Sequence, residues 1–335
     1  MDYTGLLAKK YRVNRKLTEE ERSNQLRQKV GLDVAPFYDL SVVRMNSTYL
    51  ECVDRWFVYR GWMSAICLSG IGFGFVAMFG SLFLSSSPLH VIPTKFDLHW
   101  MLFSIPFVTP FWALMIWAMF NDSFGWTHFP IRFNYRKRKV YVFRPNGTVL
   151  EAKWDKIFFT LGRCERYAGS QNWDIRGHVL DKDRETVLAT FALPGDSTEI
   201  GELKQTWEFF RRYMEEGPAS LYRDVYWCQD IVGKRETYKA GLRNLLFPGN
   251  GFRFNSSLLE GFAFYCLLFL RVLTMLFFPV VVVVSLGRWF AMRTSKIPAW
   301  PAEVEAQCAV DAFDPYRRDA SHNPEKIPLE SIRDE

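Results

Sequence analysis

The chain has 335 residues, of which 49% are hydrophobic and 17% aromatic, a content that can fill one or two domains. The formal net charge is only +6, which excludes a protein whose whole surface serves to bind a polyanion, so any basic function has to come from a local cluster. The six cysteines are scattered, with no C-x-x-C pair and no histidine at metal-ligand spacing, so neither a disulfide framework nor a zinc site is expected, and no cofactor is predicted.

Residues 1–60 are predicted to form a polar arm on the cytoplasmic side of a membrane. The N-terminus lacks the apolar core and cleavage site of a signal peptide, and position 2 lacks the glycine that myristoylation requires. Thr18 followed by Glu21 matches a capping box and predicts a short helix at that point. The chain is therefore expected to enter a membrane through internal segments.

Residues 61–120 are predicted to form a transmembrane helical hairpin. The first apolar stretch, 61–84, has no charged side chain in 24 residues and would span about 36 Å as a helix. The second stretch, 98–120, would span about 35 Å, and Pro106 and Pro110 are expected to kink it. Only 13 residues join the two stretches, so they are expected to run antiparallel.

Cations flank these stretches on one side only. Arg55 and Arg60 precede the first stretch and the run "NYRKRKVYVFR", residues 134–144, follows the second, whereas the joining loop carries one lysine and one aspartate. By the positive-inside rule, this distribution predicts a multi-pass membrane protein with a cytoplasmic N-terminus.

The basic run also supplies the predicted lipid- or partner-binding site, which consists of Arg136, Lys137, Arg138, Lys139 and Arg144. Two interpretations stay open, a topological signal alone and a site for anionic lipid, since each cation near an anionic membrane contributes about 1 kcal/mol to binding. Nucleic acid is not expected as a partner, because a site so close to the bilayer leaves little room for a duplex.

Residues 130–216 have the pattern of a small antiparallel β-domain. Six short runs alternate between apolar and polar residues, at 130–134, 140–144, 148–154, 156–161, 173–180 and 186–193. Asp196 and Glu199 resemble a capping box, and apolar residues then recur at helical spacing. This order resembles the pleckstrin-homology-like (PH-like) architecture, a β-barrel or sandwich whose open corner is closed by a C-terminal amphipathic helix.

Residues 217–257 are predicted to be an amphipathic linker. Its segment "IVGKRETYKAGLRNLLF" places Lys234, Arg235, Lys239 and Arg243 around an apolar stripe. Such a segment can lie flat on anionic lipid or pack as an ordinary helix on the β-domain, and the sequence favours neither.

Residues 258–292 form a third apolar region of 35 residues, too long for one ordinary span and short for two. Arg271 and Pro279 interrupt it, so a membrane hairpin, a re-entrant segment and a single tilted span all stay open. A polar tail, 293–335, follows. The fold class predicted from these elements is a membrane α + β protein with a helical hairpin, a PH-like β-domain and a further membrane segment.

No catalytic motif is present. The sequence contains no G-x-S-x-G, no H-E-x-x-H, no P-loop and no G-x-G-x-x-G after a predicted strand, and its five histidines are far apart. We therefore expect a non-enzymatic membrane protein that presents a binding domain. A membrane-perturbing secreted effector and a lipid-binding scaffold are the alternatives.

The whole chain also resembles a known group of proteins. The hairpin, the runs "FPIRFNYRKRKVYVFR" and "AKWDKI" and the tail "IPAWPAEVEAQ" are similar to an uncharacterised family of bacterial inner-membrane proteins that are often encoded near type VI secretion effector genes. The resemblance implies an accessory or immunity factor with a cytoplasmic or membrane-embedded protein partner. It carries no catalytic motif.

Overall fold

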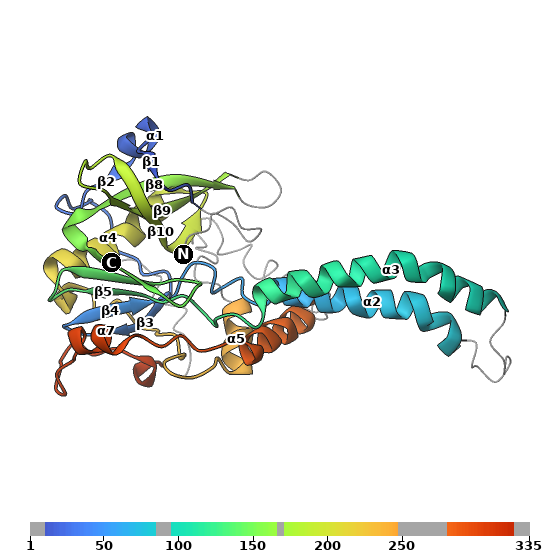
Figure 1. The fold of residues 1–335 in the computed structure, drawn as a ribbon. Helices are drawn as coiled ribbons and strands as arrows, with labels where there is room; N and C mark the ends of the chain where they lie inside the picture. The colour runs from blue at the N-terminus through green and yellow to red at the C-terminus, as the bar shows by residue number, and fades with distance from the viewer. Residues whose placement is uncertain (1–10, 85–94, 166–170, 247–279, 325–335) are drawn as a thin grey trace, which may run out of the picture.

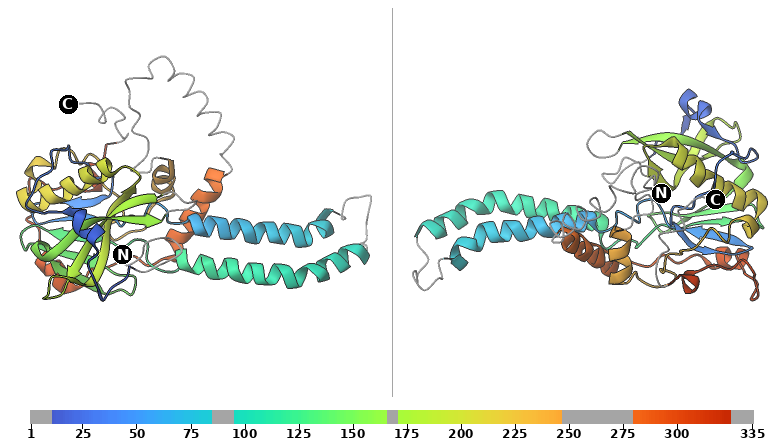
Figure 2. Two further views of the ribbon diagram at one scale, coloured as in Figure 1. Left: turned by 90° about the horizontal axis from the view of Figure 1, so that it is seen from above. Right: turned by 180° about the vertical axis from the view of Figure 1, so that it is seen from behind.

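The structure is a computed structural model that describes residues 11–84, 95–165, 171–246 and 280–324. It has two parts, a body built on two five-stranded antiparallel sheets and a pair of long helices that projects from one end of the body (Figure 1). The projection extends well beyond the body in all three views (Figures 1 and 2).

The first sheet contains strands from both sides of the helical projection. Its order is β3 (Val42–Met45), β4 (Tyr49–Cys52), β5 (Ile131–Asn134), β6 (Lys139–Phe143) and β7 (Val149–Lys153). β4 pairs with β5, with Cys52 opposite Ile131, although both long helices lie between these strands in the chain. The projection is therefore an insertion between two neighbouring strands of one sheet.

The second sheet joins three long strands to two short ones from the N-terminal segment. Its order is β1 (Arg15–Lys16), β10 (Thr186–Ser197), β9 (Gln171–Leu180), β8 (Ile157–Glu165) and β2 (Gln25–Leu26). Between β1 and β2 lies α1 (Glu19–Ser23), whose capping box of Thr18 and Glu21 confirms the sequence prediction. The N-terminal segment thus borders this sheet on both edges.

Helix α4 (Ile200–Glu216) fills the space between the sheets with an aromatic core. Phe210 stacks on Phe133 of the first sheet, with ring centroids 4.9 Å apart. Trp207 stacks on Trp154 at 5.7 Å and contacts Phe159 of the second sheet at 4.8 Å. Burying a large apolar side chain contributes about 1.5–3 kcal/mol, so this helix contributes strongly to holding the two sheets together.

Strands β5 to β10 and helix α4 lie where the alternation and the helical period predicted them. The predicted capping box of α4 is wrong. Glu199 occupies the N-cap position without a side-chain hydrogen bond, while Ser197 accepts from the Glu199 amide and donates to Glu202.

The projection consists of α2 (Trp62–Leu84) and α3 (Lys95–Asp122), which run antiparallel. Gly74 lets them approach closely, because a Cβ at this position would lie 2.6 Å from Nε1 of Trp112. Their exposed large apolar side chains are Trp62, Ile66, Leu68, Phe73, Phe75, Val76, Leu102, Phe103, Ile105, Phe107, Phe111, Leu114, Ile116, Trp117 and Phe120.

The remaining elements cover the body and the base of the projection. They are η1 (Trp154–Lys156), η3 (Pro218–Ser220), α5 (Tyr238–Leu246), a helix over residues 280–294, α7 (Ala302–Gln307) and η5 (Ala320–His322). The C-terminal segment runs along the first sheet, where Arg318 exchanges backbone hydrogen bonds with Met45 of β3 at 2.8 and 2.9 Å.

The predicted fold class, a multi-span membrane α + β protein, is wrong. The described residues form a mixed α/β fold with two antiparallel sheets, and they contain one helix that is long and apolar enough to cross a membrane, Leu102–Phe120. The apolar part of α2, Trp62–Val76, is too short to count as a membrane-spanning helix by the same measure of length and hydropathy. Of the third apolar region, 258–292, only residues 280–292 are described, as part of the helix over 280–294, and the rest lies outside the described residues.

Candidate functional site

The two helices of the projection are fastened to each other where they meet the body, a region called the root here. Asp122, the last residue of α3, accepts hydrogen bonds from the backbone amides of Gly61 and Ser64 at 3.2 and 2.9 Å and from the Ser64 hydroxyl at 2.9 Å. A carboxylate at this position satisfies free amides at the start of α2 and interacts favourably with the helix dipole. The end of one helix therefore caps the beginning of the other.

A buried ion pair attaches the helix over 280–294 to the root. The guanidinium of Arg288 contacts the Glu236 carboxylate through Nε and Nη2 at 2.7 and 3.0 Å. Its Nη1 donates to the backbone carbonyls of Phe57, Val58 and Arg60, which form the turn before α2. Because both charged groups are buried and bonded, this arginine joins three segments that are far apart in the sequence.

Glycine is required where these segments cross. Gly61 has φ +90°, and a Cβ there would lie 2.1 Å from the Cα of Arg288. Gly287 makes a similar close approach, since its Cβ would lie 2.5 Å from the Cβ of Ala65 in α2. The helix over 280–294 therefore packs backbone to backbone against the start of the projection.

Beside the root, a shallow cleft of about 50 Å³ separates the turn before α2 from β10 and α5. Its wall contains Asp39 and Leu40, with φ values of +51° and +47°, a conformation that non-glycine residues seldom adopt. Opposite them, β10 has a register shift between Ala192 and Asp196. Strained backbone and strand bulges are concentrated at functional sites, which makes this cleft the candidate ligand site.

Asp39 gives the cleft its distinctive electrostatics. Its carboxylate lies against Gly195, and its Oδ1 is buried with no hydrogen-bond partner among the described residues. Burial, followed by the negative charges of Asp196 and Glu202, raises the pKa of Asp39 to about 8. The raised pKa favours the protonated, neutral form of this side chain at neutral pH.

The other lining residues add a cation, an aromatic ring and a hydroxyl to the cleft wall. Arg243 lies over the ring of Trp227, with its guanidinium carbon 4.1 Å from the centroid. The hydroxyl of Ser41 donates to the Tyr38 carbonyl at 2.7 Å. The lining contains no histidine or cysteine among the described residues.

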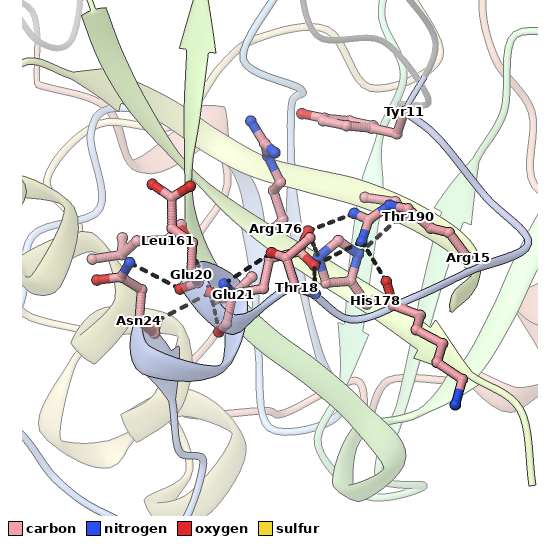
Figure 3. Close-up of polar contacts among 12 residues, drawn as sticks. Tyr11, Arg15, Thr18, Glu20, Glu21, Asn24, Leu161, Arg176, His178 and Thr190 are labelled. Carbon is pink, nitrogen blue, oxygen red and sulfur yellow. Dashed lines mark hydrogen bonds and ion pairs between the residues drawn. The ribbon is translucent and has the colours of Figure 1, made fainter. Parts of the chain in front are cut away.

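A second polar cluster anchors the N-terminal segment on the second sheet (Figure 3). His178 of β9 lies 2.8 Å from the Thr190 hydroxyl through Nδ1 and 3.3 Å from Glu21 through Nε2, while Arg15 binds both Glu21 oxygens at 2.8 and 2.5 Å. Burial alone would raise the pKa of Glu21, but hydrogen bonds from Arg15, His178 and the Thr18 amide hold it well below its usual range.

The Thr190 hydroxyl, the His178 imidazole and the Glu21 carboxylate follow one another in the order of a catalytic triad. Unlike a catalytic triad, they do not line an accessible cleft. His178 and Thr190 are buried, and neither belongs to the cleft wall. The cluster therefore serves to fix the capping-box helix on the sheet. Among the described residues, no group of three or more histidine, cysteine or carboxylate side chains could hold a metal ion.

The five predicted binding residues do not form one cluster. Arg136 and Lys137 lie exposed in the β5–β6 turn, at the end of the body far from the projection (Figure 1). Arg138 pairs with Asp155 and Glu215 at 2.6 and 2.7 Å and donates to the Met214 carbonyl. This arginine therefore contributes to the structure of the body.

Lys139 and Arg144 complete the predicted set, and they lie at opposite ends of β6. Lys139 forms an ion pair with Glu151 at 2.7 Å and donates a hydrogen bond to the side-chain oxygen of Gln307 at 3.0 Å. Arg144 lies in the next turn, at the root end of the sheet, where the Trp126 indole donates to the adjoining Pro145 carbonyl at 3.0 Å. Of the five residues, only Arg144 is close to the root.

The residues of the root and the cleft were not identified from the sequence. Asp122 follows the second apolar stretch and Arg288 lies near the end of the third, where charges are commonly read as topology signals, and Asp39 belongs to no motif. Gly61, the first residue of the first apolar stretch, was one available signal for a close contact. Nothing in the sequence pairs Arg288 with Glu236.

The fold and the root define a class of protein, a two-sheet body that carries an apolar helical projection between neighbouring strands of one sheet. The chain belongs to a family of unknown function, DUF6708, which matches residues 109–312 and so more than half of the chain. The matched range includes Asp122, Glu236 and Arg288 of the root. The searches of curated proteins and of solved structures returned no match.

Proposed function

We propose that the protein is a membrane-associated binding protein, in which lipid covers the apolar surface of the α2–α3 projection and the body presents its cleft beside the membrane. The exposure of large apolar side chains on the projection carries this proposal, with Phe73, Phe107 and Trp117 exposed by 76%, 66% and 65%. A soluble monomer rarely leaves a contiguous apolar surface of this extent in water.

The distribution of these side chains favours lipid over a protein partner. Successive residues of an α-helix are about 100° apart, so the exposed Phe103 and Phe107 of α3 share one face, with ring centroids 5.4 Å apart, whereas the exposed Ile105 between them points to the opposite side. The window Leu102–Phe120 has a mean hydropathy of 1.7. A protein partner on one side would leave the other sides uncovered, whereas lipid covers all of them.

The body supports the binding role. Two packed sheets closed by α4 are the elements that a PH-like domain would have, and aromatic, basic and acidic side chains line the cleft. A bacterial inner membrane, and an accessory or immunity role linked to type VI secretion, stay predictions from the sequence resemblance. The membrane-perturbing effector and the lipid-binding scaffold also stay predictions.

Flotation of the full chain with vesicles of neutral phosphatidylcholine tests the proposal. The wild-type protein is expected to float, and a variant combining Phe73→Ser, Phe107→Ser and Trp117→Ser is expected to remain largely in the soluble fraction. Phe313→Ser is the matched control, because Phe313 is 92% exposed but lies on the C-terminal segment of the body. A wild-type protein that stays soluble in water as a discrete oligomer would show that a second copy, not lipid, covers the projection.

A further inference from the structure

We propose that a basic collar around the root binds the phosphate-bearing headgroups of anionic phospholipids. The collar consists of Lys234, Arg235, Lys239, Arg293 and Lys296, all of them exposed. The inference rests on the proposed membrane association and adds to it the lipid class that the body prefers.

Hydrogen bonds bring the two segments of the collar together and fasten them to the end of α3. Arg235, before α5, donates to the Ser295 carbonyl at 3.2 Å, next to Lys296. Tyr238 of α5 bonds the Ser285 hydroxyl at 2.8 Å. The backbone amide of Lys296 donates to the Gly125 carbonyl just beyond α3, also at 2.8 Å. α5 and the helix over 280–294 therefore lie at the base of the projection, as Figures 1 and 2 show.

The nearby acidic groups do not neutralise the collar. Asp230 pairs with Lys234 at 2.7 Å, and this is a solvent-exposed pair. Glu236 is buried and bonded to Arg288 and Asn244. Asp122 is buried and caps α2. Four of the five collar cations thus have no side-chain ion pair among the described residues, so their charge is available to an anionic surface.

Aromatic side chains lie beside the collar at the base of the projection, and they indicate where the membrane surface lies. Trp62 begins α2 and Trp289 lies in the helix over 280–294, and both are partly exposed at the base of the projection. The guanidinium carbon of Arg293 lies 5.9 Å from the Trp289 ring centroid. Tryptophan is enriched at the boundary between lipid headgroups and acyl chains, so the collar cations lie at headgroup level.

The size of the effect follows from the number of cations. A cation near an anionic membrane surface contributes about 1 kcal/mol, which corresponds to about a fivefold change in affinity. A variant that combines Lys239→Gln, Arg293→Gln and Lys296→Gln is therefore expected to lose about 100-fold of the preference for anionic over zwitterionic lipid. Raising the salt concentration is expected to weaken binding by the wild type more than by the variant.

The experiment uses the full chain in neutral detergent micelles, titrated with short-chain phosphatidylglycerol or phosphatidylcholine while tryptophan fluorescence is recorded. Inorganic phosphate is added as a competitor in a separate arm, and it is expected to leave phosphatidylglycerol binding unchanged. The matched control is Arg136→Gln with Lys137→Gln, two exposed cations at the far end of the body.

Equal affinity of the wild type for both lipids would overturn the inference, and so would an equal loss of preference in the control variant. Either outcome differs from a failure of the proposed function. If only the collar inference is wrong, the wild type and the collar variant still float with neutral vesicles. If the proposed function itself is wrong, the wild type does not float.

Discussion

The body and the projection use the same aromatic residues in opposite ways. In the body, Phe133, Trp154 and Trp207 are completely buried between the sheets and α4. In the projection, Phe73, Phe107 and Trp117 face outward. The body builds its own apolar interior, whereas the projection leaves large apolar side chains exposed. Hydrophobicity alone therefore does not distinguish a core residue from an exposed one, because that depends on which other side chains pack against it.

The largest effect is expected from a matched pair of tryptophan truncations. Trp207→Ala should lower the free energy of unfolding by about 3–5 kcal/mol, because it leaves a cavity between two sheets. Trp117→Ala should change that free energy by less than about 1 kcal/mol, since the side chain contacts little of the protein. Chemical denaturation of both variants in the same detergent compares them. Equal losses would mean that the projection is part of the folding core.

Breaking the connection between the two regions should have the next largest effect. Arg288→Gln leaves the Glu236 carboxylate buried without its cation and is expected to cost about 3–5 kcal/mol of unfolding free energy. The matched control is Lys234→Gln, which removes an exposed pair with Asp230 and should cost less than about 1 kcal/mol.

Proteolysis gives a second measurement of the root. In the Arg288→Gln variant, the turn before α2 loses the donor to the carbonyls of Phe57, Val58 and Arg60. Cleavage at this turn should therefore be faster than in the wild type while the body stays resistant. Uniform sensitivity throughout the chain would contradict a local role for this arginine.

Asp39, in the cleft wall, is expected to make the free energy of unfolding depend on pH. Its pKa of about 8 lies above the value of about 4 in an unfolded chain, so the folded state holds one more proton between these values. The free energy of unfolding should consequently fall as pH rises through this window, by about 1 kcal/mol from pH 6 to pH 7. Asp39→Asn is expected to remove this decrease.

The control for this prediction is Asp183→Asn. Hydrogen bonds from Thr186 and from the Thr186 and Glu185 amides lower the pKa of Asp183 to about 2, so it does not titrate between pH 6 and 7. Denaturation curves at the two pH values compare the three proteins. A wild-type slope that survives Asp39→Asn would show that another group holds the proton.

Local patterns predicted most of the elements but not how they are joined. Alternation identified β5 to β10 because each strand has one face in the core, and Thr18 with Glu21 identified α1 through its own backbone. The pairing of β4 with β5 across the projection could not be predicted, since it depends on contacts between residues that are distant in the sequence.

The candidate site was less predictable than the fold, because it too depends on contacts between residues that are distant in the sequence. The sequence places Arg136 to Lys139 together, and the fold then directs them into different environments, with Arg138 and Lys139 held in ion pairs. The collar shows the reverse case. Its members come from two segments separated by more than fifty residues, Lys239 in one and Arg293 in the other, and hydrogen bonds between α5 and the helix over 280–294 bring these segments together.

The smallest effect is expected at the end of the body far from the projection. Arg136→Gln with Lys137→Gln removes the two exposed cations of the β5–β6 turn and should change the free energy of unfolding by less than about 0.5 kcal/mol. Flotation with vesicles that contain phosphatidylglycerol should also be unchanged, because β5 leads away from the root and places this turn beyond the reach of the membrane surface. A marked loss of flotation would mean that the body lies with this end on the lipid, and the orientation of the body relative to the projection would then have to be revised.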